Sequence, residues 1–451
     1  MNALGAAILA VLLGVILAGT RRLALLAMLA GVLYTNSSQQ ITVAGLNLFA
    51  LRFLELAGFA RVLALREFSF SRLAKIDRLL VLLYAYTAVV YCLYESSGQA
   101  FVAGQAVDAC LCYFTFRGLI QGVEDFRWCL RAFVVLLAPY AVLVVIESVT
   151  RHNPFVQAGA IAIGEAWERG GRVRCLGTFQ HPSLLGTLGA SFLPLYIGLA
   201  FAPRDRRLAL VGAVLCGVII VAANSGGPVS ACAAGLVGWL LWPWRTRMRR
   251  VRWALVGLIL LAAVFMKAPL WYLPAKVSAF SGGGGWHRSY LMQVAFQHLD
   301  RWWLAGMPRS ETDTWFPYSL ASIDSADITN QFLGFGLNGG LVAVALFILL
   351  LARAFGNVGQ ALASLRPNPG ASRETEALLW GLGVVLAVHI ATWFGIPYFD
   401  QTYALWFFHL AAITAVSQQT LQATALAAGP DALALDPGAA FEPEPQLDQK
   451  L

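Results

Sequence analysis

The sequence predicts an all-α protein, a polytopic bundle of 12 or 13 transmembrane helices. Of its 451 residues, 59% are hydrophobic and only 12% are charged, and the mean hydropathy is +0.67. A soluble domain of this size could not bury so much apolar surface in one core. The hydrophobic residues also fall in runs long enough to cross a bilayer, so we expect lipid to be the main solvent of the chain.

The spans follow from the lengths of the apolar runs. A helix needs about 20 apolar residues to cross a bilayer, and somewhat fewer when flanking side chains snorkel to the headgroups. Because the second run is short, we predict 12 or 13 spans. The runs lie near residues 3–20, 22–34, 41–60, 79–95, 101–117, 130–149, 183–202, 208–223, 228–243, 253–268, 329–352, 377–396 and 403–419.

The first run and the cysteines limit how the chain is processed. The run begins within three residues of Met1, has no basic region before it, and is followed by Arg21 and Arg22. This pattern indicates a retained span rather than a cleaved signal peptide. The seven cysteines show no zinc-ligand spacing, and most lie in apolar runs. We therefore expect neither a disulfide framework nor a metal site.

Lysine and arginine are distributed unequally between alternate loops. One set of loops holds 21 of them; the other holds nine, all in two long loops at residues 150–182 and 267–328. The positive-inside rule places the first set in the cytoplasm and makes the two long loops outer loops. The net charge of +8 thus reflects membrane orientation rather than nucleic-acid binding. Residues 1–419 form the predicted bundle, and 420–451, with acidic residues among Pro, Ala and Gly, a disordered cytoplasmic tail.

The first outer loop carries Arg169, Arg172 and Arg174, followed by the segment GTFQHPSLLG that leads into the seventh span. Several guanidinium groups at the end of a helix bundle can hold a phosphate or diphosphate in a bidentate manner. The alternative is that these arginines snorkel to lipid headgroups. His181 has two interpretations, a proton carrier or a helix cap, and the second is the more usual at the start of a helix.

The second outer loop contains Trp286, His287 and Arg288 after a run of glycines, and Trp302 and Trp303 further on. Tryptophan at an interface usually forms the aromatic belt of a membrane protein, and this is what we expect for Trp302 and Trp303. Planar rings beside polar groups also stack on sugar rings. The loop therefore combines an arginine with the side chains that bind carbohydrate.

The second outer loop closes with Asp324, Asp327, Thr329 and Asn330, just before the eleventh span. Asp327 has two equally supported roles. Its carboxylate is placed to accept hydrogen bonds from the first turn of the span as a helix cap. It is also placed to act as a general base on a substrate in the outer loops.

A few polar residues lie inside the predicted spans. Arg52 and Glu55 stand three residues apart on one face of the third span, where they form either a self-neutralising pair or a functional one, and Asp108 lies midway along the fifth. Ionisable groups in lipid face the bundle interior. The NSGGP segment at residues 224–228 predicts only a tight hairpin. No phosphate-binding glycine motif, nucleophile elbow or zinc-protease motif occurs, so no cofactor is expected.

Taken in order, these motifs resemble those of the O-antigen ligase and polysaccharide polymerase superfamily of bacterial membrane glycosyltransferases. The resemblance covers roughly residues 170–350. Arg174 with GTFQHPSLLG resembles the family's arginine followed by a GTF, HPN and LG pattern. NSGGPVSACAAGL is similar to its serine-arginine-glycine hairpin, and Arg288 beside Trp286 stands where its large-loop arginine is expected. DITNQFLGFGLNGGLVA resembles the closing histidine-asparagine motif.

Two positions depart from the family pattern. Gly226 stands where the hairpin arginine is expected, and Thr329 stands where the family has its loop histidine. Threonine cannot act as a base near neutral pH. The resemblance then leaves Asp327, Asp324 or His287 for that duty, or a different treatment of the acceptor, and it weakens a ligase assignment more than the superfamily assignment.

The resemblance implies a C-type membrane glycosyltransferase fold in the bacterial inner membrane, with its active face in the periplasm. The expected reaction is inverting transfer or polymerisation of an undecaprenyl-diphosphate-linked glycan onto a glycan or lipid acceptor, without a nucleotide sugar or metal. Arg174 and Arg288 would hold the diphosphate with help from Arg172, and Asp327 would serve the acceptor. The other residues expected to contact substrate are Arg169, His181, His287 and Asn330.

Two other functions remain open from the sequence. A transporter or flippase of lipid-linked oligosaccharide would make no bond, and its polar groups should gather at mid-membrane on broken helices. Here most of the polar groups lie in the outer loops, which favours an enzyme. A scaffold protein in envelope assembly would leave Arg174 and Arg288 replaceable.

Overall fold

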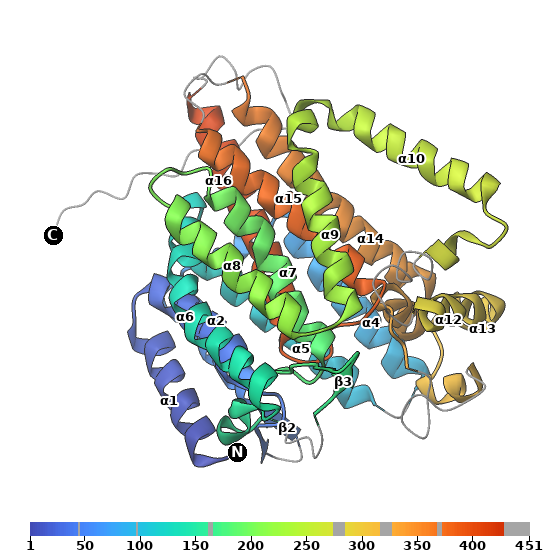
Figure 1. The fold of residues 1–451 in the computed structure, drawn as a ribbon, viewed down its shortest axis with the longest axis horizontal. Helices are drawn as coiled ribbons and strands as arrows, with labels where there is room; N and C mark the ends of the chain where they lie inside the picture. Colours follow the sequence, from blue (N-terminus) through green and yellow to red (C-terminus); the bar gives the residue numbers. More distant parts are fainter. Residues whose placement is uncertain are drawn as a thin grey trace.

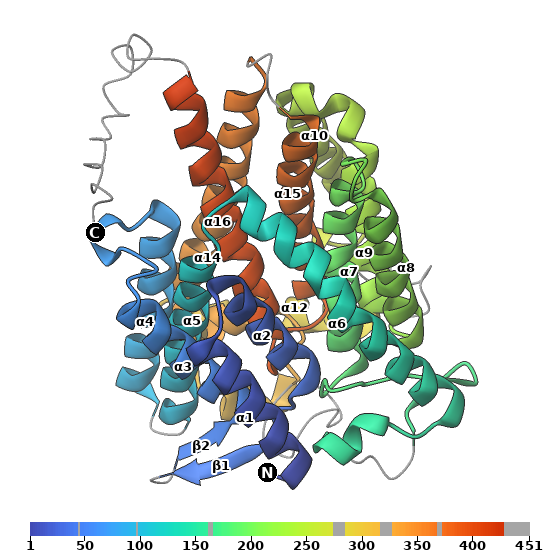
Figure 2. The same cartoon turned by 90° about the vertical axis from the view of Figure 1, so that its left-hand side faces the viewer.

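The computed structural model describes residues 1–43, 46–95, 98–160, 166–273, 285–315, 327–367 and 372–427. Within these ranges the chain is mostly helical, as predicted. The long helices stand side by side in one bundle (Figures 1 and 2). Following the predicted orientation, we call the end that carries the first turns of α7, α9 and α14 the outer end, and the opposite end the inner end.

The first half of the chain forms six long helices and a short hairpin. The run at 41–60, predicted as one span, is wrong in its first part: residues up to Phe49 are extended, with Ile41 paired to Leu48, and the helix begins at Ala50. Alternating apolar and polar residues favour a strand there. The elements are α1 (Ala3–Ala18), α2 (Arg21–Tyr34), β1 (Gln40–Val43), β2 (Leu46–Phe49), α3 (Ala50–Ala64), η1 (Phe70–Arg72), α4 (Lys75–Tyr94), α5 (Gln99–Leu119) and α6 (Val123–Thr150).

The second half of the chain adds seven long helices, and one of them, α7, is central. Almost every residue of α7 is buried, and it packs against α8, α9 and α15. A Cβ at Gly189 would lie 2.5 Å from the carbonyl oxygen of Cys216, so glycine lets the backbones of α7 and α8 approach closely. These helices are α7 (Pro182–Leu199), α8 (Arg206–Ala222), α9 (Gly226–Leu240), α10 (Met248–Phe265), α14 (Gln331–Leu365), α15 (Arg373–Trp393) and α16 (Thr402–Ala427), with η3 (Trp242–Arg247) between α9 and α10.

Five of these helices are long and apolar enough to cross a membrane, namely α4, α6, α7, α14 and α15. The other predicted spans also coincide with helices, but their crossing of a bilayer stays a prediction. Helix α16 continues to Ala427, so the boundary drawn at residue 420 falls inside a helix. Residues 418–427 are mostly good helix formers, which explains the extension. The rest of the predicted tail lies outside the described residues.

The outer loops fold into short elements. The first loop contains η2 (Pro154–Ala158) and a hairpin of β3 (Glu168–Arg169) with β4 (Arg172–Val173), and the second contains η4 (Leu270–Tyr272), α12 (Gly285–Gln297), α13 (Leu299–Trp302) and η5 (Arg309–Trp315). The belt role predicted for Trp302 is wrong, because its ring is buried in a small apolar core with Leu291 and Leu337 and its indole N–H donates to Ala295. Trp303, by contrast, is 50% exposed.

Helix α14 is broken near its outer end. Gly339 and Gly340 leave helical geometry, and Gly340 has a φ of +67°, which favours glycine. The break is closed by the second outer loop: the N–H of Leu341 donates to the carbonyl of Trp303, and the N–H of Met307 donates to that of Leu337. The second outer loop is therefore tied to α14 by backbone hydrogen bonds.

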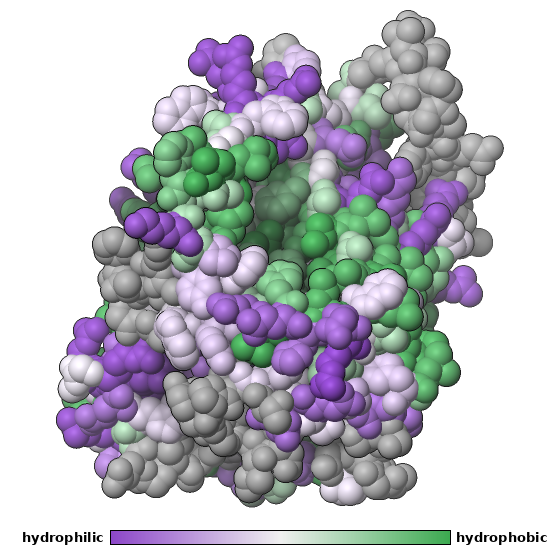
Figure 3. Space-filling view, turned by 90° about the vertical axis from the view of Figure 1, so that its right-hand side faces the viewer, coloured by the Kyte–Doolittle hydropathy of each residue, from purple (hydrophilic) through white to green (hydrophobic). Residues whose placement is uncertain are grey.

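Helix α10 projects from the bundle instead of packing into it (Figure 1). None of its residues, all of which the structure describes, is buried, and its surface is apolar at Leu258, Leu261 and Phe265. The face from which it projects contains a hollow with apolar walls (Figure 3). An apolar helix without protein partners is suited to contact with lipid.

Candidate functional site

The outer arginines are placed by a contact between two loops. Gly170 and Gly171 both have positive φ, which makes the tight turn between β3 and β4. The side chain of Asn224, which precedes α9, donates to the carbonyls of Arg169 and Arg172 at 3.0 Å each. The hairpin is thus fastened beside the first turn of α9. The NSGGP segment, predicted as a plain hairpin, therefore has a positioning role as well.

Arg174 is held directly after this hairpin. Its backbone N–H donates to the carbonyl of Trp167 at 2.7 Å, and its guanidinium carbon lies 6.0 Å from the centre of the Trp167 ring. The same ring meets His181 edge to face. The Nε of Arg174 is buried and has no hydrogen-bond partner among the described residues. Its ring contact is weak compensation for a buried cation.

Arg288 on α12 reaches the bundle from the second outer loop. A Cβ at Gly395, in the segment after α15, would lie 2.9 Å from its guanidinium carbon, and one at Gly227, on α9, would lie 3.8 Å from its Nη2. Glycine at 395 therefore makes room for the guanidinium. In the part of the chain that the structure describes, neither Arg174 nor Arg288 has a carboxylate within ion-pair distance.

Arg169, Arg174 and Arg288, with His181 between them, form what we call the outer arginine cluster. Burial and the charge of Arg169 lower the pKa of Arg174 to about 10. Burial, and then Arg169, lower the pKa of Arg288, against an opposing effect of Asp327. Burial, and then the charges of Arg174, Arg288 and Arg169 in that order, together lower the pKa of His181 to about 4. Because the charges of the arginines affect the pKa values of Arg174, Arg288 and His181, these side chains lie in one region at the outer end.

Two helix N-termini face the same region. His181 is the N-cap of α7, and its Nδ1 accepts from the N–H of Ser183 at 3.0 Å, which confirms the cap interpretation. The hydroxyls of Ser183 and Ser225, at the starts of α7 and α9, are 2.7 Å apart. Helix N-termini carry partial positive charge and attract anions. The cluster thus joins guanidinium groups to two helix dipoles of the same sign.

Asp327 interacts electrostatically with Arg288 of the cluster. Loss of surrounding water raises its pKa, and His287 and Arg288 oppose that rise. The pKa of His287 is lowered by burial, with opposite effects from Asp327 and Arg288. The cap role for Asp327 is wrong, because the N-cap of α14 is Asn330, which accepts from Phe332 and Leu333.

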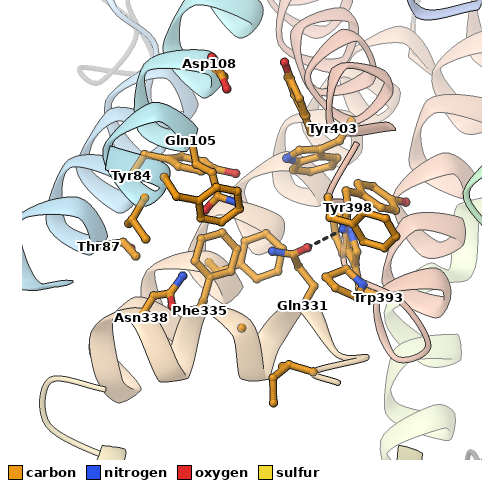
Figure 4. A pocket seen from close by; sticks show the side chains of 18 of the residues that line it. Tyr84, Thr87, Gln105, Asp108, Gln331, Phe335, Asn338, Trp393, Tyr398 and Tyr403 are labelled. Carbon is orange, nitrogen blue, oxygen red and sulfur yellow. Dashed lines mark hydrogen bonds between the residues drawn. The ribbon is translucent and has the colours of Figure 1, made fainter. Parts of the chain in front are cut away.

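A cavity of about 460 Å³ begins at Asp327 and extends into the bundle between α4, α5, α14 and α16. Its walls are mainly aromatic, and three amide side chains interrupt them (Figure 4). One of these, Gln331, accepts from the N–H of Tyr398 at 3.1 Å. The side chains and backbone that line the cavity include those of Tyr84, Gln105, Asp108, Asp327, Gln331, Gly334, Phe335, Asn338, Trp393 and Tyr403.

An ion pair closes the far end of this cavity. Arg52 donates from Nε and Nη2 to the two oxygens of Asp108, at 2.7 and 2.8 Å. The predicted pairing of Arg52 with Glu55 is therefore wrong. Glu55 is fully buried and accepts from the hydroxyl of Tyr403 at 2.8 Å. The three-residue spacing on α3 could not reveal this arrangement, because α5 and α16 supply the partners.

The structure thus brings together Arg169, Arg174, His181, His287, Arg288 and Asp327. Arg172 is exposed at the edge of the hairpin, with its guanidinium 3.5 Å from the side chain of Asn224, and the Asn330 side-chain oxygen is committed to capping α14. Sequence reasoning missed Gly395 and the cavity amides. No short motif marks these residues, because their role depends on which helices are neighbours.

Among the residues described, no group of three His, Cys, Asp or Glu side chains is arranged to hold a metal ion. The chain matches none of the known protein families, and no curated protein is significantly similar to it. The function therefore has to be argued from the geometry of the outer end.

Proposed function

We propose that this protein is a membrane glycosyltransferase that transfers or polymerises an undecaprenyl-diphosphate-linked glycan, in the manner of a polysaccharide polymerase or O-antigen ligase. The observation that carries the proposal is the outer arginine cluster. It contains half-buried guanidinium groups for which the described residues provide no carboxylate partner, at the N-termini of two helices. This combination suits a diphosphate, which offers several oxygens for bidentate hydrogen bonds.

The chemistry assigns a task to each group. A hydroxyl oxygen of the acceptor forms a bond to the anomeric carbon of the donor sugar on the face opposite the diphosphate. The bond from that carbon to the diphosphate oxygen breaks, and its electron pair leaves with the diphosphate. Arg174 and Arg288 stabilise the charge that develops there. Asp327 takes the hydroxyl proton, and its raised pKa makes it a better base than an ordinary aspartate.

The surroundings of the cluster suit a lipid-linked donor. The hollow beside α10 has apolar walls, which suit a polyprenyl chain. The predicted orientation puts the cluster on the periplasmic face of the bacterial inner membrane, where lipid-linked glycans are available as donors. A nucleotide sugar or a metal ion is not required, because the diphosphate is already attached to the anomeric carbon.

The second candidate is a transporter or flippase of lipid-linked oligosaccharide. The broken helix α14 and the buried Arg52–Asp108 pair are features that such proteins use. Arg52 and Asp108 already bind each other through two hydrogen bonds, however, whereas no described carboxylate pairs with Arg174 or Arg288. An unsatisfied cation cluster at one end of the bundle favours catalysis at that end over passage through the middle.

Replacing the cluster arginines tests the proposal. Arg174→Ala and Arg288→Ala should each abolish glycan transfer in cells that carry only the variant, with normal amounts of membrane protein. Lysine should restore little, because an ammonium group cannot make two parallel hydrogen bonds to a diphosphate. The measurement is the amount of glycan product on gels. Arg301→Ala, an exposed arginine of the same outer loop, is the matched control and should keep wild-type product.

The precursor distinguishes the two candidates. If the protein is a transferase, the alanine variants accumulate lipid-linked glycan that a lectin reaches from outside in spheroplasts. A flippase variant instead accumulates the precursor where the lectin cannot reach it. Wild-type product from both alanine variants would remove these arginines from the mechanism and refute the proposal.

A further inference from the structure

The cavity behind Asp327 has a composition different from that of the outer arginine cluster. Its one cationic lining side chain, among the residues described, is that of Arg52, which Asp108 neutralises through two hydrogen bonds. The cavity therefore offers little attraction to a second diphosphate or another anion. Its volume of about 460 Å³ falls within the ~300–1,000 Å³ typical of small-molecule sites.

The amides of the cavity have hydrogen-bonding capacity to spare. Asn338 is 7% exposed, and its Oδ1 is buried without a partner among the described residues. Such an atom normally costs free energy unless a ligand or water satisfies it. Gln331 uses its oxygen on the backbone of Tyr398, and its amide nitrogen is turned to the other side (Figure 4). Gln105 adds a third neutral amide from α5.

Aromatic rings fill the space between these amides. Tyr84 from α4 and Phe335 from α14 meet edge to face with ring centres 5.8 Å apart, and Trp393 and Tyr403 line the opposite side (Figure 4). Neutral amides can both donate to and accept from hydroxyl groups, and flat rings cover the apolar C–H faces of a sugar. An acidic ligand would leave the aromatic rings unused, and a hydrocarbon chain would leave the amides unused.

The position of Asp327 indicates which sugar enters. This residue lines the cavity and also interacts electrostatically with Arg288, so the two sites share it. In the proposed reaction the acceptor hydroxyl meets the base on the side away from the leaving diphosphate. A sugar in the cavity would therefore present its hydroxyl to Asp327 from the acceptor side.

We propose that this cavity is the acceptor subsite and that it binds the terminal, uncharged sugar of the acceptor glycan between aromatic rings, with Asn338, Gln331 and Gln105 on its hydroxyls. The inference rests on the proposed function, since it takes the outer arginine cluster as the donor diphosphate site. It adds a substrate class for the acceptor: a carbohydrate rather than a lipid hydroxyl or an anionic group.

Glycine residues of α14 provide the test. Gly334 lines the cavity, and a Cβ there would meet no other atom within 4 Å, so Gly334→Leu fills the cavity without a clash at its first carbon. Gly356 on the same helix has equal room but is exposed and outside the cavity, so Gly356→Leu is the matched control. Blocking the acceptor should reduce glycan product in cells about 100-fold or more, while the control keeps wild-type product.

A sugar-free probe separates the two sites. Farnesyl diphosphate should raise the melting temperature of purified wild-type protein and of Gly334→Leu alike, and should not raise that of Arg288→Ala. Wild-type product from Gly334→Leu overturns the acceptor subsite and leaves the proposed function standing. If farnesyl diphosphate stabilises none of the proteins and Arg288→Ala makes normal product, the proposed function fails and the subsite fails with it.

Asn338→Leu gives an independent answer in case Gly334→Leu folds poorly. It removes the unpartnered buried amide oxygen while keeping a side chain of similar size, so the melting temperature should not fall. Product should fall at least tenfold if the amide binds a sugar hydroxyl. Unchanged product in a stable Asn338→Leu protein overturns the assignment of this residue and of the cavity.

Discussion

The two ends of the bundle differ in whether their buried or partly buried arginines have carboxylate partners among the described residues. At the inner end, arginines bridge helices by pairing with carboxylates: Arg127 on α6 with Glu374 on α15 at 2.9 Å, and Arg131 with Asp205 at 2.8 Å. At the outer end, Arg174 and Arg288 are half-buried beside further positive charge, and within the described ranges no carboxylate reaches ion-pair distance of either.

This difference distinguishes the arginines that are paired within the protein from those for which we propose a function. Burying a cation is costly, and the inner end offsets that cost within the protein itself. At the outer end the described residues provide no such compensation for Arg174 and Arg288, which suits the anion-binding role that we propose for them. The net charge of either end would not reveal this distinction. The distinction becomes visible only when each guanidinium group is examined for a carboxylate partner.

After the loss expected for the two arginine variants, the next largest effect is expected at Asp327, which makes no ion pair with any residue that the structure describes. Asp327 is not committed to an ion pair with Arg288, so it can serve the acceptor. Asp327→Asn should reduce glycan transfer by about 10²–10⁴-fold, the usual contribution of a general base. The wild-type rate should also fall as pH drops through the raised pKa of Asp327, and the asparagine variant should lack that acidic limb.

Measurements of transfer rate against pH in detergent-solubilised or membrane preparations check this prediction. Protein amount and melting temperature should be the same in both forms, because Asn330, not Asp327, caps α14. Full activity in the asparagine variant would assign the proton transfer to another group.

The second effect compares one arginine from each end. Arg127 is 4% exposed, and Arg127→Ala leaves Glu374 without this partner, so it should cost on the order of 3–5 kcal/mol of stability. Arg288→Ala removes an unpaired charge, so its melting temperature should equal or exceed that of the wild type. Thermal unfolding in detergent measures both. Equal destabilisation by the two substitutions would show that the outer arginine is also paired in solution.

The smallest effect concerns His181, the titratable group inside the cluster. Its pKa is about 4 in the folded protein and 6.5 ordinarily, so between these pH values the unfolded chain binds a proton that the folded protein does not. Stability should therefore fall as pH falls from 6.5 toward 4, by at most about 3 kcal/mol. His181→Asn keeps a side chain able to cap α7 but cannot titrate.

Melting temperatures of the two proteins at pH 7.5 and pH 5 measure this difference. They should agree at the higher pH and diverge at the lower, with the asparagine variant more stable. The same decrease in both would show that His181 is not held neutral by Arg174 and Arg288.

The helices could be predicted from sequence because each apolar run must satisfy its own backbone in lipid. The same reasoning failed at residues 40–49, where the run is apolar but the alternation of Ile41, Val43 and Leu48 favours a hairpin. It also missed the break at Gly339 and Gly340. A glycine pair in an apolar run is compatible with either a straight or a broken helix, and the second outer loop decides between them.

The site could be predicted only in part. Sequence order and the family resemblance singled out Arg174 and Arg288, and the structure brings both near His181. The sequence could not predict that these arginines lie apart from carboxylates among the described residues, because this depends on which parts of the chain fold beside them. The cap role that the sequence left open for Asp327 belongs to Asn330, which directly precedes the first helical residue of α14. The cavity amides carry no local signal at all.

The break in α14 has a consequence for the order of assembly. The helical hydrogen bond between the N–H of Leu341 and the carbonyl of Leu337 is lost at the glycine pair. The N–H of Leu341 donates instead to the carbonyl of Trp303, and the carbonyl of Leu337 accepts from the N–H of Met307 and from the hydroxyl of Tyr94. Hydrocarbon offers no substitute for these partners. Helix α14 can therefore settle in a bilayer only once residues 303–307 have docked against it. Since these residues are synthesised first, the loop that carries Arg288 acts as an internal template for the span that follows it.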